Sequence, residues 1–185
     1  MTIFYLVRHG QPDYSLCDER GYPGFGRDLA PLSEEGVRQA EQTARDHRLK
    51  DAQMIVSSPY TRALQTAAII SRVTGVPLAV EMDLHEWLPD LTFRYSTGEE
   101  SVAQSKAFDA NRGKCPDDAH PYESLEQIRA RMVRVRDKYA SYDKVVLVGH
   151  GMALRSIAPA GRIRPAEIVE FTYETGQPVC EYEFV

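Results

Sequence analysis

Two histidines each follow a short apolar run and are flanked by glycine on at least one side. His9 is the middle residue of an Arg-His-Gly triplet at 8–10, and His150 is the middle residue of a Gly-His-Gly triplet at 149–151. Because ligands of open α/β sheets bind beyond the carboxyl ends of the strands, both imidazoles are expected at a binding site. The glycines, Gly151 included, allow the backbone to approach a ligand closely. Their pairing favours a functional role over a structural one.

Two arginines add anion-binding groups near the same strand ends. Arg8 directly precedes the first histidine, and Arg62 follows a predicted strand and the helix start at Ser58-Pro59. Counted from Ser58 as the N-cap, Arg62 is the fourth helical residue, near the positive end of the helix dipole. Guanidinium groups offer planar forks to phosphate oxygens, and a protonated His150 would add a further charge-assisted bond. Phosphate is therefore the predicted ligand.

Strands and helices alternate along the chain, and this alternation must position these groups. Apolar runs predict buried strands over 2–7, 54–57 and 144–149, and an alternating pattern predicts two final strands over 167–175 and 179–184, joined by a tight turn. Helices are predicted over 33–47 and 124–139, each starting at an N-cap serine, and also from Ser58 onward, over 101–111 and over 151–158. The pattern predicts an α/β three-layer sandwich, with a mainly parallel central sheet flanked by helices.

Length and composition limit the function classes. The 185 residues, 43% of them hydrophobic, are expected to form a single domain over 1–185. A net charge of −5 with no long basic run disfavours nucleic acid as a partner. The N-terminal stretch lacks the features of a signal peptide and is too short to cross a bilayer, so we expect a cytoplasmic protein with no membrane partner. Three scattered cysteines indicate neither disulfides nor a metal site.

Several blocks of the sequence resemble the histidine phosphatase superfamily, and they occur in the family's order from Arg8 to Gly151. Together they are far more specific than any short motif alone. The resemblance implies a phosphoglycerate mutase-like fold and an enzyme of the phosphatase branch. The blocks are Arg8-His9-Gly10, then Asp28-Leu29-Ala30-Pro31-Leu32-Ser33 with Gly36, Gln39 and Ala40, then Ser57 to Ala67, Leu84-His85-Glu86, and Val148-Gly149-His150-Gly151.

The resemblance also implies residue roles, without a metal or another cofactor. Imidazole attacks phosphorus only when its attacking nitrogen is unprotonated, and a bond from the other ring nitrogen to a backbone carbonyl would hold that tautomer. Arginines would stabilise the charge on the transferred phosphoryl group in place of a cation. The implied roles are His9 as the nucleophile, Glu86 as the proton donor to the leaving oxygen, and Arg8, Arg62 and His150 as phosphate ligands. Gly151, which directly follows His150, is a further candidate for phosphate binding.

Other side chains compete with Glu86 for the role of proton donor. A carboxylic acid must be protonated when it reaches the leaving oxygen, which requires a special environment for Glu86. Asp83, His85 and Asp90 lie close enough in the sequence to compete for this role.

The sequence departs from the family pattern after the first triplet. Where the family often continues with Glu-Thr and, three residues on, Asn, this chain has Gln11-Pro12 and Ser15. Ser15 can still donate one hydrogen bond to phosphate, whereas Pro12 removes a backbone donor. Gln11 is therefore a candidate for substrate specificity. These changes affect the expected substrate and leave the nucleophile unchanged.

A segment over 87–122 breaks the periodic pattern with several glycines and prolines, and we expect it to be an insertion over the sheet edge that selects the substrate. Within it, Arg94 stands between two aromatic residues that could hold its side chain over the pocket. The segment mixes basic and acidic residues and provides no net positive cradle for a substrate carboxylate.

These observations favour a phosphatase that hydrolyses a phosphomonoester of a small metabolite through a phosphohistidine intermediate. A cofactor-dependent phosphoglycerate mutase is the alternative within the same fold. A catalytically silent phosphate-binding or adaptor protein is the alternative from another class, and a metal hydrolase is weaker because no carboxylate completes a ligand set. The sequence leaves the substrate and the oligomeric state open.

Overall fold

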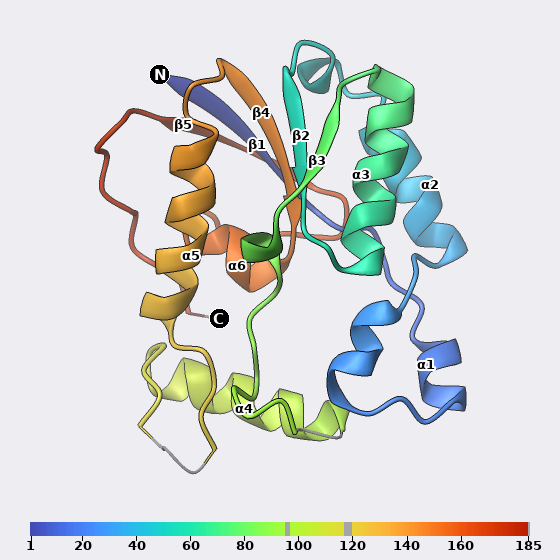
Figure 1. Cartoon of the computed structure of the whole chain (residues 1–185), viewed down its shortest axis with the longest axis vertical. Coiled ribbons are helices and arrows are strands. Elements are labelled where there is room, and N and C mark those ends of the chain that lie inside the picture. Colours follow the sequence, from blue (N-terminus) through green and yellow to red (C-terminus); the bar gives the residue numbers. More distant parts are fainter. Residues whose placement is uncertain (95–96, 117–119, 185) are drawn as a thin grey trace.

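The computed structural model describes residues 1–94, 97–116 and 120–184, which form one five-stranded sheet with helices on both faces (Figure 1). The strand order is β3-β2-β4-β1-β5, with β5 antiparallel to β1 and the other neighbours parallel. The predicted mainly parallel sheet is therefore confirmed, although the short β3 was not predicted. The strands are β1 (Thr2–Arg8), β2 (Met54–Ser57), β3 (Leu78–Val80), β4 (Lys144–Gly149) and β5 (Ile168–Tyr173).

The helices form the outer layers of the sandwich. Helices α2 and α3 cover one face of the sheet, and α5 and α6 cover the other (Figure 1). The α-helices are α1 (Ser15–Glu19), α2 (Glu34–Thr43), α3 (Thr61–Thr74), α4 (Gly98–Ala110), α5 (Leu125–Lys138) and α6 (Gly151–Arg155), and short 3-10 helices span Gly24–Leu29, His47–Leu49 and Met82–Leu84. Among the described residues, no helix has both the length and the apolar character needed to cross a membrane.

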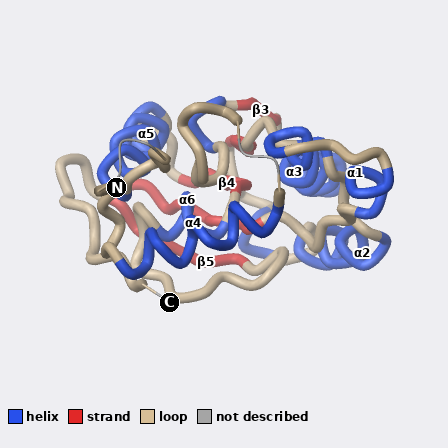
Figure 2. Tube along the Cα trace, turned by 90° about the horizontal axis from the view of Figure 1, so that it is seen from below, coloured by secondary structure: helices blue, strands red, loops and turns tan. Residues whose placement is uncertain are grey.

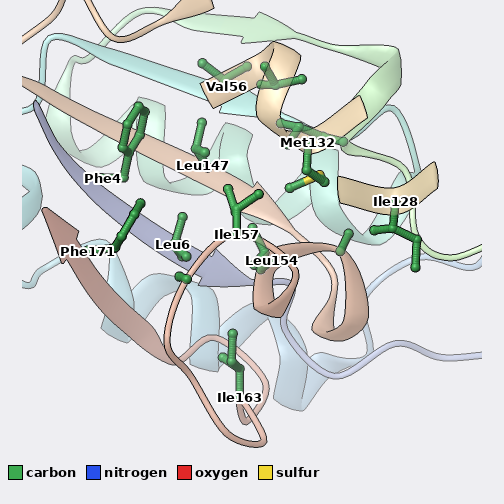
Figure 3. Close-up of a cluster of buried hydrophobic side chains, with 14 of the residues drawn as sticks. Phe4, Leu6, Val56, Ile128, Met132, Leu147, Leu154, Ile157, Ile163 and Phe171 are labelled. Atoms are coloured by element: carbon green, nitrogen blue, oxygen red, sulfur yellow. The ribbon is translucent and has the colours of Figure 1, made fainter. Parts of the chain in front are cut away.

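Strand β1 shows how the sequence builds a core on each face. Phe4 and Leu6 belong to the cluster beneath α5 and α6, which Figure 3 shows together with Met132. The alternate residues, Tyr5 and Val7, belong to the cluster beneath α2 and α3. Because side chains alternate along a strand, a strand covered on both faces must be apolar throughout. This burial fixes the position of β1, and therefore the position of His9, which directly follows its last residue.

The prediction that a helix begins directly after Ser58 is wrong by two residues. Helix α3 begins at Thr61, and Tyr60 is an extended N-cap with φ −67° and ψ 135°. The Ser58 hydroxyl lies 2.8 Å from His150 Nε2 and accepts from the Tyr60 N–H at 3.3 Å, so it serves the site and the turn before the helix. Arg62 is consequently the second helical residue and not the fourth.

The predicted final strand over 179–184 is also wrong, although the turn before it forms. Its backbone is engaged by side chains instead of a neighbouring strand, since Arg129 Nη2 donates to the Cys180 carbonyl at 2.6 Å. The Tyr182 ring packs edge-on against Phe108 of α4, with 6.1 Å between the ring centroids. Aromatic packing against α4 therefore takes the place of sheet pairing here.

Helix α4 carries the middle of the segment over 87–122. It begins at Gly98, three residues before the predicted start, because Thr97 and Glu100 form a reciprocal capping box. The helix crosses the molecule beyond the carboxyl ends of the parallel strands and lies in front of the sheet when viewed from below (Figures 1 and 2). Phe108 anchors it in the main core. Helix α4 therefore lies beyond the edge of the sheet at which the parallel strands end.

Candidate active site

Pairing between β1 and β4 brings the two histidines together. Arg8 lies opposite Gly149 in the register, and the His9 N–H donates to the Gly149 carbonyl at 3.0 Å. The rings of His9 and His150 are consequently 5.1 Å apart between centroids. His9 is 5% exposed and His150 is fully buried. The predicted meeting of the two imidazoles at one edge of the sheet is confirmed.

The surroundings of His9 fix its tautomer. Nδ1 lies 2.7 Å from the Gly10 carbonyl, which can only accept, so Nδ1 carries the proton and Nε2 does not. Arg62 Nε donates to Nε2 at 3.3 Å. Burial, followed by the charge of Arg62, lowers the pKa of His9 to about 3. His9 is therefore neutral at physiological pH, with the lone pair of Nε2 directed at a guanidinium.

Gly10 and Gly36 allow the chain that follows β1 to pass close to helix α2. A Cβ atom on Gly10 would lie 2.5 Å from the Gly36 carbonyl oxygen, closer than real Cβ atoms approach. The Gly10 N–H donates to the Thr66 hydroxyl at 3.1 Å, and that hydroxyl donates to the Arg62 carbonyl at 2.8 Å. The strand end, α2 and α3 are thereby held at fixed separations around His9.

His150 is held less completely. Its Nε2 pairs with the Ser58 hydroxyl, while its buried Nδ1 has no hydrogen-bond partner among the described residues. Burial, with a smaller contribution from Arg62, lowers the pKa of His150 well below its ordinary value. The protein alone thus opposes the protonated His150 expected from the sequence, and only a neighbouring anion would favour it.

The two arginines approach the histidines from different elements. Arg62 is 5% exposed, and its Nη1 donates to Asp28 at 3.0 Å. Arg8 Nη1 donates to the Ile163 carbonyl at 2.8 Å, while its buried Nε has no partner among the described residues. Burial lowers the pKa of the Arg8 guanidinium, a strong base that stays charged. Each arginine therefore keeps donor capacity for an anion.

These groups open into a pocket of about 570 Å³ at the carboxyl ends of the strands. Its lining contains four of the predicted site residues, Arg8, His9, Arg62 and Glu86. Gly151 lines an adjoining cavity of about 290 Å³ that shares Arg8 and Glu86. Within the described ranges, no three His, Cys, Asp or Glu side chains gather as a metal-binding group.

Glu86 lines both cavities, and its carboxylate lies against the first turn of helix α6. Its Oε1 accepts from the Ala153 N–H at 3.1 Å and from the Trp87 N–H at 2.9 Å, and its Oε2 accepts from the Met152 N–H at 3.3 Å. These three N–H donors orient the carboxylate. A proton on Glu86 would turn one acceptor oxygen into a donor, so one of these bonds would have to be exchanged.

The competing proton-donor candidates lie outside the pocket. The Asp83 carboxylate pairs with Arg134 at 3.1 Å, and His85 Nδ1 bonds to the Glu86 carbonyl at 2.7 Å. Asp90 accepts from the Thr92 N–H at 2.8 Å. Glu86 is thus the acidic residue of this loop that faces the histidines.

A buried ion pair that the sequence analysis missed holds the loop over 83–88. Arg131 of α5 makes a two-pronged pair with Glu123, at 2.6 and 2.9 Å, and both side chains are at most 6% exposed. Arg131 Nη1 also donates to the carbonyls of Asp83 and His85, at 2.6 and 2.7 Å. The signal in the sequence is a charged residue within the apolar stripe of α5, which requires a buried partner.

Three predicted residues do not reach the pocket. Ser15 is exposed, and its N–H and hydroxyl both bond to Asp13. Gln11 is exposed, and its N–H donates to the Gln39 side chain at 2.9 Å. Arg94 is exposed and lines a separate hollow. The neighbour proposed to hold it, Tyr95, lies outside the described residues.

Other residues occupy the walls that these three were expected to form. The loop after β1 contributes Tyr14, Phe25 and Arg27, and the turn before α3 contributes Tyr60. Asp28, which pairs with Arg62, also lines the pocket, and burial raises its pKa. Asp28 belongs to a block that resembles the family, but nothing in its local sequence indicates that it meets Arg62.

Comparison with known proteins gives the family. The pattern of the histidine phosphatase superfamily (branch 1) matches residues 4–180. This chain belongs to that superfamily. It is an enzyme of phosphoryl transfer with a phosphoglycerate mutase-like fold.

Individual relatives differ in the activity that they are named for. The uncharacterized phosphatase PhoE of Bacillus subtilis is 30% identical over 162 residues, covering 85% of this chain and 76% of the relative. A protein named "Probable phosphoglycerate mutase GpmB" from Yersinia pestis is also 30% identical over 162 residues, covering 83% and 72%. The structure of a mycobacterial glucosyl-3-phosphoglycerate phosphatase superposes with a TM-score of 0.72 at 24% identity, covering 95% and 92%, and shows the shared fold.

The Arg131–Glu123 pair predicts a large stability difference between two arginines of α5. Arg131→Met would leave the buried Glu123 carboxylate without its partner, and we expect a loss of about 3–5 kcal/mol in the free energy of unfolding. Arg134→Met, which breaks an ion pair whose arginine is 64% exposed, should cost less than about 1 kcal/mol. Urea unfolding of both variants measures the difference. Equal losses would contradict this account of the loop.

The low pKa of His9 predicts a pH dependence of stability. Between its folded pKa of about 3 and its ordinary value of 6.5, the unfolded state binds more protons at this residue. This histidine therefore destabilises the fold as pH falls below 6.5 and has no such effect above it. From pH 7 to pH 4.5, wild-type protein should lose roughly 2–3 kcal/mol more than His9→Gln. Urea unfolding at both pH values tests this, and parallel losses would refute it.

Proposed function

We propose that this enzyme hydrolyses a phosphomonoester of a small metabolite through a phosphohistidine at His9, without a metal. The observation that carries the proposal is the bond from His9 Nδ1 to the Gly10 carbonyl, which leaves Nε2 as an unprotonated nucleophile inside an anion-binding pocket. We also propose that the protein is cytoplasmic and that residues 1–185 act as a single domain.

In the first step, His9 Nε2 attacks phosphorus in line with the ester oxygen. The N–P bond forms as the P–O bond breaks, and Glu86 gives its proton to the leaving oxygen. Arg8, Arg62 and His150 surround the transferred group and donate to its oxygens, while Gly151 gives it room at the start of α6. Arg62 must then exchange its bond to Nε2 for bonds to phosphate.

In the second step, water attacks the phosphohistidine. The ionised Glu86 accepts a proton from this water, the N–P bond breaks, and its electron pair returns to His9 Nε2. Inorganic phosphate leaves, and both residues regain their initial protonation. The backbone N–H groups of Met152 and Ala153 orient the Glu86 carboxylate that accepts this proton.

Hydrolysis is favoured over mutase activity by the walls of the pocket. A mutase must hold a substrate carboxylate and shield its phosphoenzyme from water. The described part of the segment over 87–122 contributes no basic side chain to the pocket, only Trp87, Pro89, Gly98, Ser101 and Val102. Substrate selection by this segment is retained in the proposal, through apolar contacts and without Arg94.

Rapid quenching with ³²P-labelled ester tests the intermediate. Wild-type protein should trap label that is acid-labile and alkali-stable, as a phosphoramidate is, and EDTA should leave turnover unchanged because arginines supply the charge. His9→Ala should lose the label and at least about 10³-fold in kcat/KM. His47→Ala, which removes an exposed histidine, serves as the control. Full labelling of His9→Ala, or strict dependence on added metal, would reject the mechanism.

Glu86→Gln tests the proton donor. The loss in kcat should be about 10²–10⁴-fold for an alkyl phosphate, whose leaving oxygen needs a proton, and small for nitrophenyl phosphate, whose leaving oxygen is a weak base. Steady-state phosphate release with both esters gives the comparison. If both esters lose activity equally, the donor lies elsewhere.

A further inference from the structure

We propose that the leaving-group part of the pocket is an aromatic-walled subsite for an uncharged, ring-sized apolar group. The enzyme would then prefer aryl or arylalkyl phosphates over phosphorylated carboxylic acids. This inference rests on the proposed phosphatase activity and specifies its substrate class.

Aromatic and apolar side chains line the pocket beside the phosphate ligands. Rings from three places in the chain line it: Tyr14 and Phe25 after β1, and Tyr60 before α3. Val102 of α4 faces the same pocket and is 55% exposed. A flat apolar group could be buried between these side chains, which is a favourable exchange for surface that otherwise contacts water.

The charged groups of the pocket are already engaged. Arg62 pairs with Asp28, and with Arg8 it surrounds the phosphate position. The remaining cation in the described lining, Arg27, forms an ion pair with Asp18 and lies over the Tyr14 ring, 4.7 Å from its centroid. An anionic leaving group would therefore have to compete with Asp18 for Arg27.

A second aromatic contact extends this wall to the rim. Phe93 of the segment over 87–122 packs against Phe25, with 4.7 Å between the ring centroids. Phe93 is nevertheless 63% exposed, and its φ of 59° lies in the left-handed region that bulky residues avoid. An exposed aromatic side chain on a strained backbone indicates a functional constraint. A bound ring that covered Phe93 would bury this apolar surface.

The adjoining cavity makes the opposite prediction and sharpens the test. It is lined by Arg162, which is exposed and has no hydrogen bond or ion pair with the described residues. If the leaving group entered this cavity, Arg162 would favour a substrate with a second anionic group. The two cavities can therefore be distinguished by substrate charge.

The experiment compares benzyl phosphate with 3-phosphoglycerate, both esters of primary alcohols, by steady-state phosphate release. We expect kcat/KM to be at least about tenfold higher for benzyl phosphate. Phe93→Asn keeps a residue that tolerates positive φ and removes the ring, so it should lower kcat/KM for benzyl phosphate about fivefold. Its inhibition constant for inorganic phosphate should remain unchanged, because the phosphate ligands are intact.

Two valines provide matched variants of smaller effect. Val102→Ala should lower benzyl phosphate hydrolysis about two- to threefold, whereas Val73→Ala, a similarly exposed valine of α3 outside the pocket, should not. If Phe93→Asn does not fold, as judged by its melting temperature, the valine pair decides the question.

Each remaining outcome bears on one proposal. A preference for 3-phosphoglycerate over benzyl phosphate would contradict the aromatic subsite and leave the proposed phosphatase activity in place. So would hydrolysis of 3-phosphoglycerate that is lost in Arg162→Ala. Unchanged benzyl phosphate kinetics in both Phe93→Asn and Val102→Ala would also overturn it. Failure to hydrolyse any ester would instead reject the proposed function.

Discussion

The parallel pairing of β1 with β4 is the constraint on which the site depends. It sets the Cα atoms of Arg8 and Gly149 side by side, so the residues that follow them, His9 and His150, emerge together beyond the strand ends. The His9 N–H continues the ladder by donating to Gly149. Because both strands are buried on both faces, a slip by one residue would move every side chain into the core on the other face and disrupt the packing of both cores. The stability of the core therefore fixes the distance between the imidazoles.

Burial then determines the charge state of the site. Two neutral imidazoles lie beside two guanidinium groups, and the low pKa of His9 follows from burial and from Arg62. Arg8 Nε and His150 Nδ1 are buried polar atoms without partners in the described structure. Buried polar atoms without partners are costly to the fold and strengthen binding to a group that satisfies them. A phosphoryl group has the charge and the oxygens to do so.

The loop that carries Glu86 is held by helices α5 and α6. The Arg131–Glu123 pair joins α5 to the loop over 83–88, and the first turn of α6 holds the carboxylate itself. His150 lies between the end of β4 and the start of α6, and the first turn of α6 binds the Glu86 carboxylate. This strand–helix connection therefore positions both the second histidine and the acid. Loss of the ion pair would affect stability and chemistry together, because Arg131 also donates to the carbonyls of Asp83 and His85 next to Glu86.

The sequence alone determined the elements whose signals are local. Buried apolar runs located β1, β2 and β4 to within one residue, and serine caps located the starts of α2 and α5. Because His9, Arg62 and His150 adjoin strand ends or a helix start, their meeting could be predicted. Glu86 followed from the resemblance to the family.

Only the tertiary structure decided which loop residues reach the pocket. Ser15, Gln11 and Arg94 were expected there, whereas Tyr14, Phe25 and Asp28 line it. The final strand failed for the same reason, because Tyr182 packs on α4 instead of pairing with the sheet. Loops have no periodic pattern, and their paths depend on long-range contacts such as those of Phe93 with Phe25. The pattern that identifies a strand depends on residues that are neighbours in the sequence. The partner of a loop side chain is determined by the packing of the whole chain.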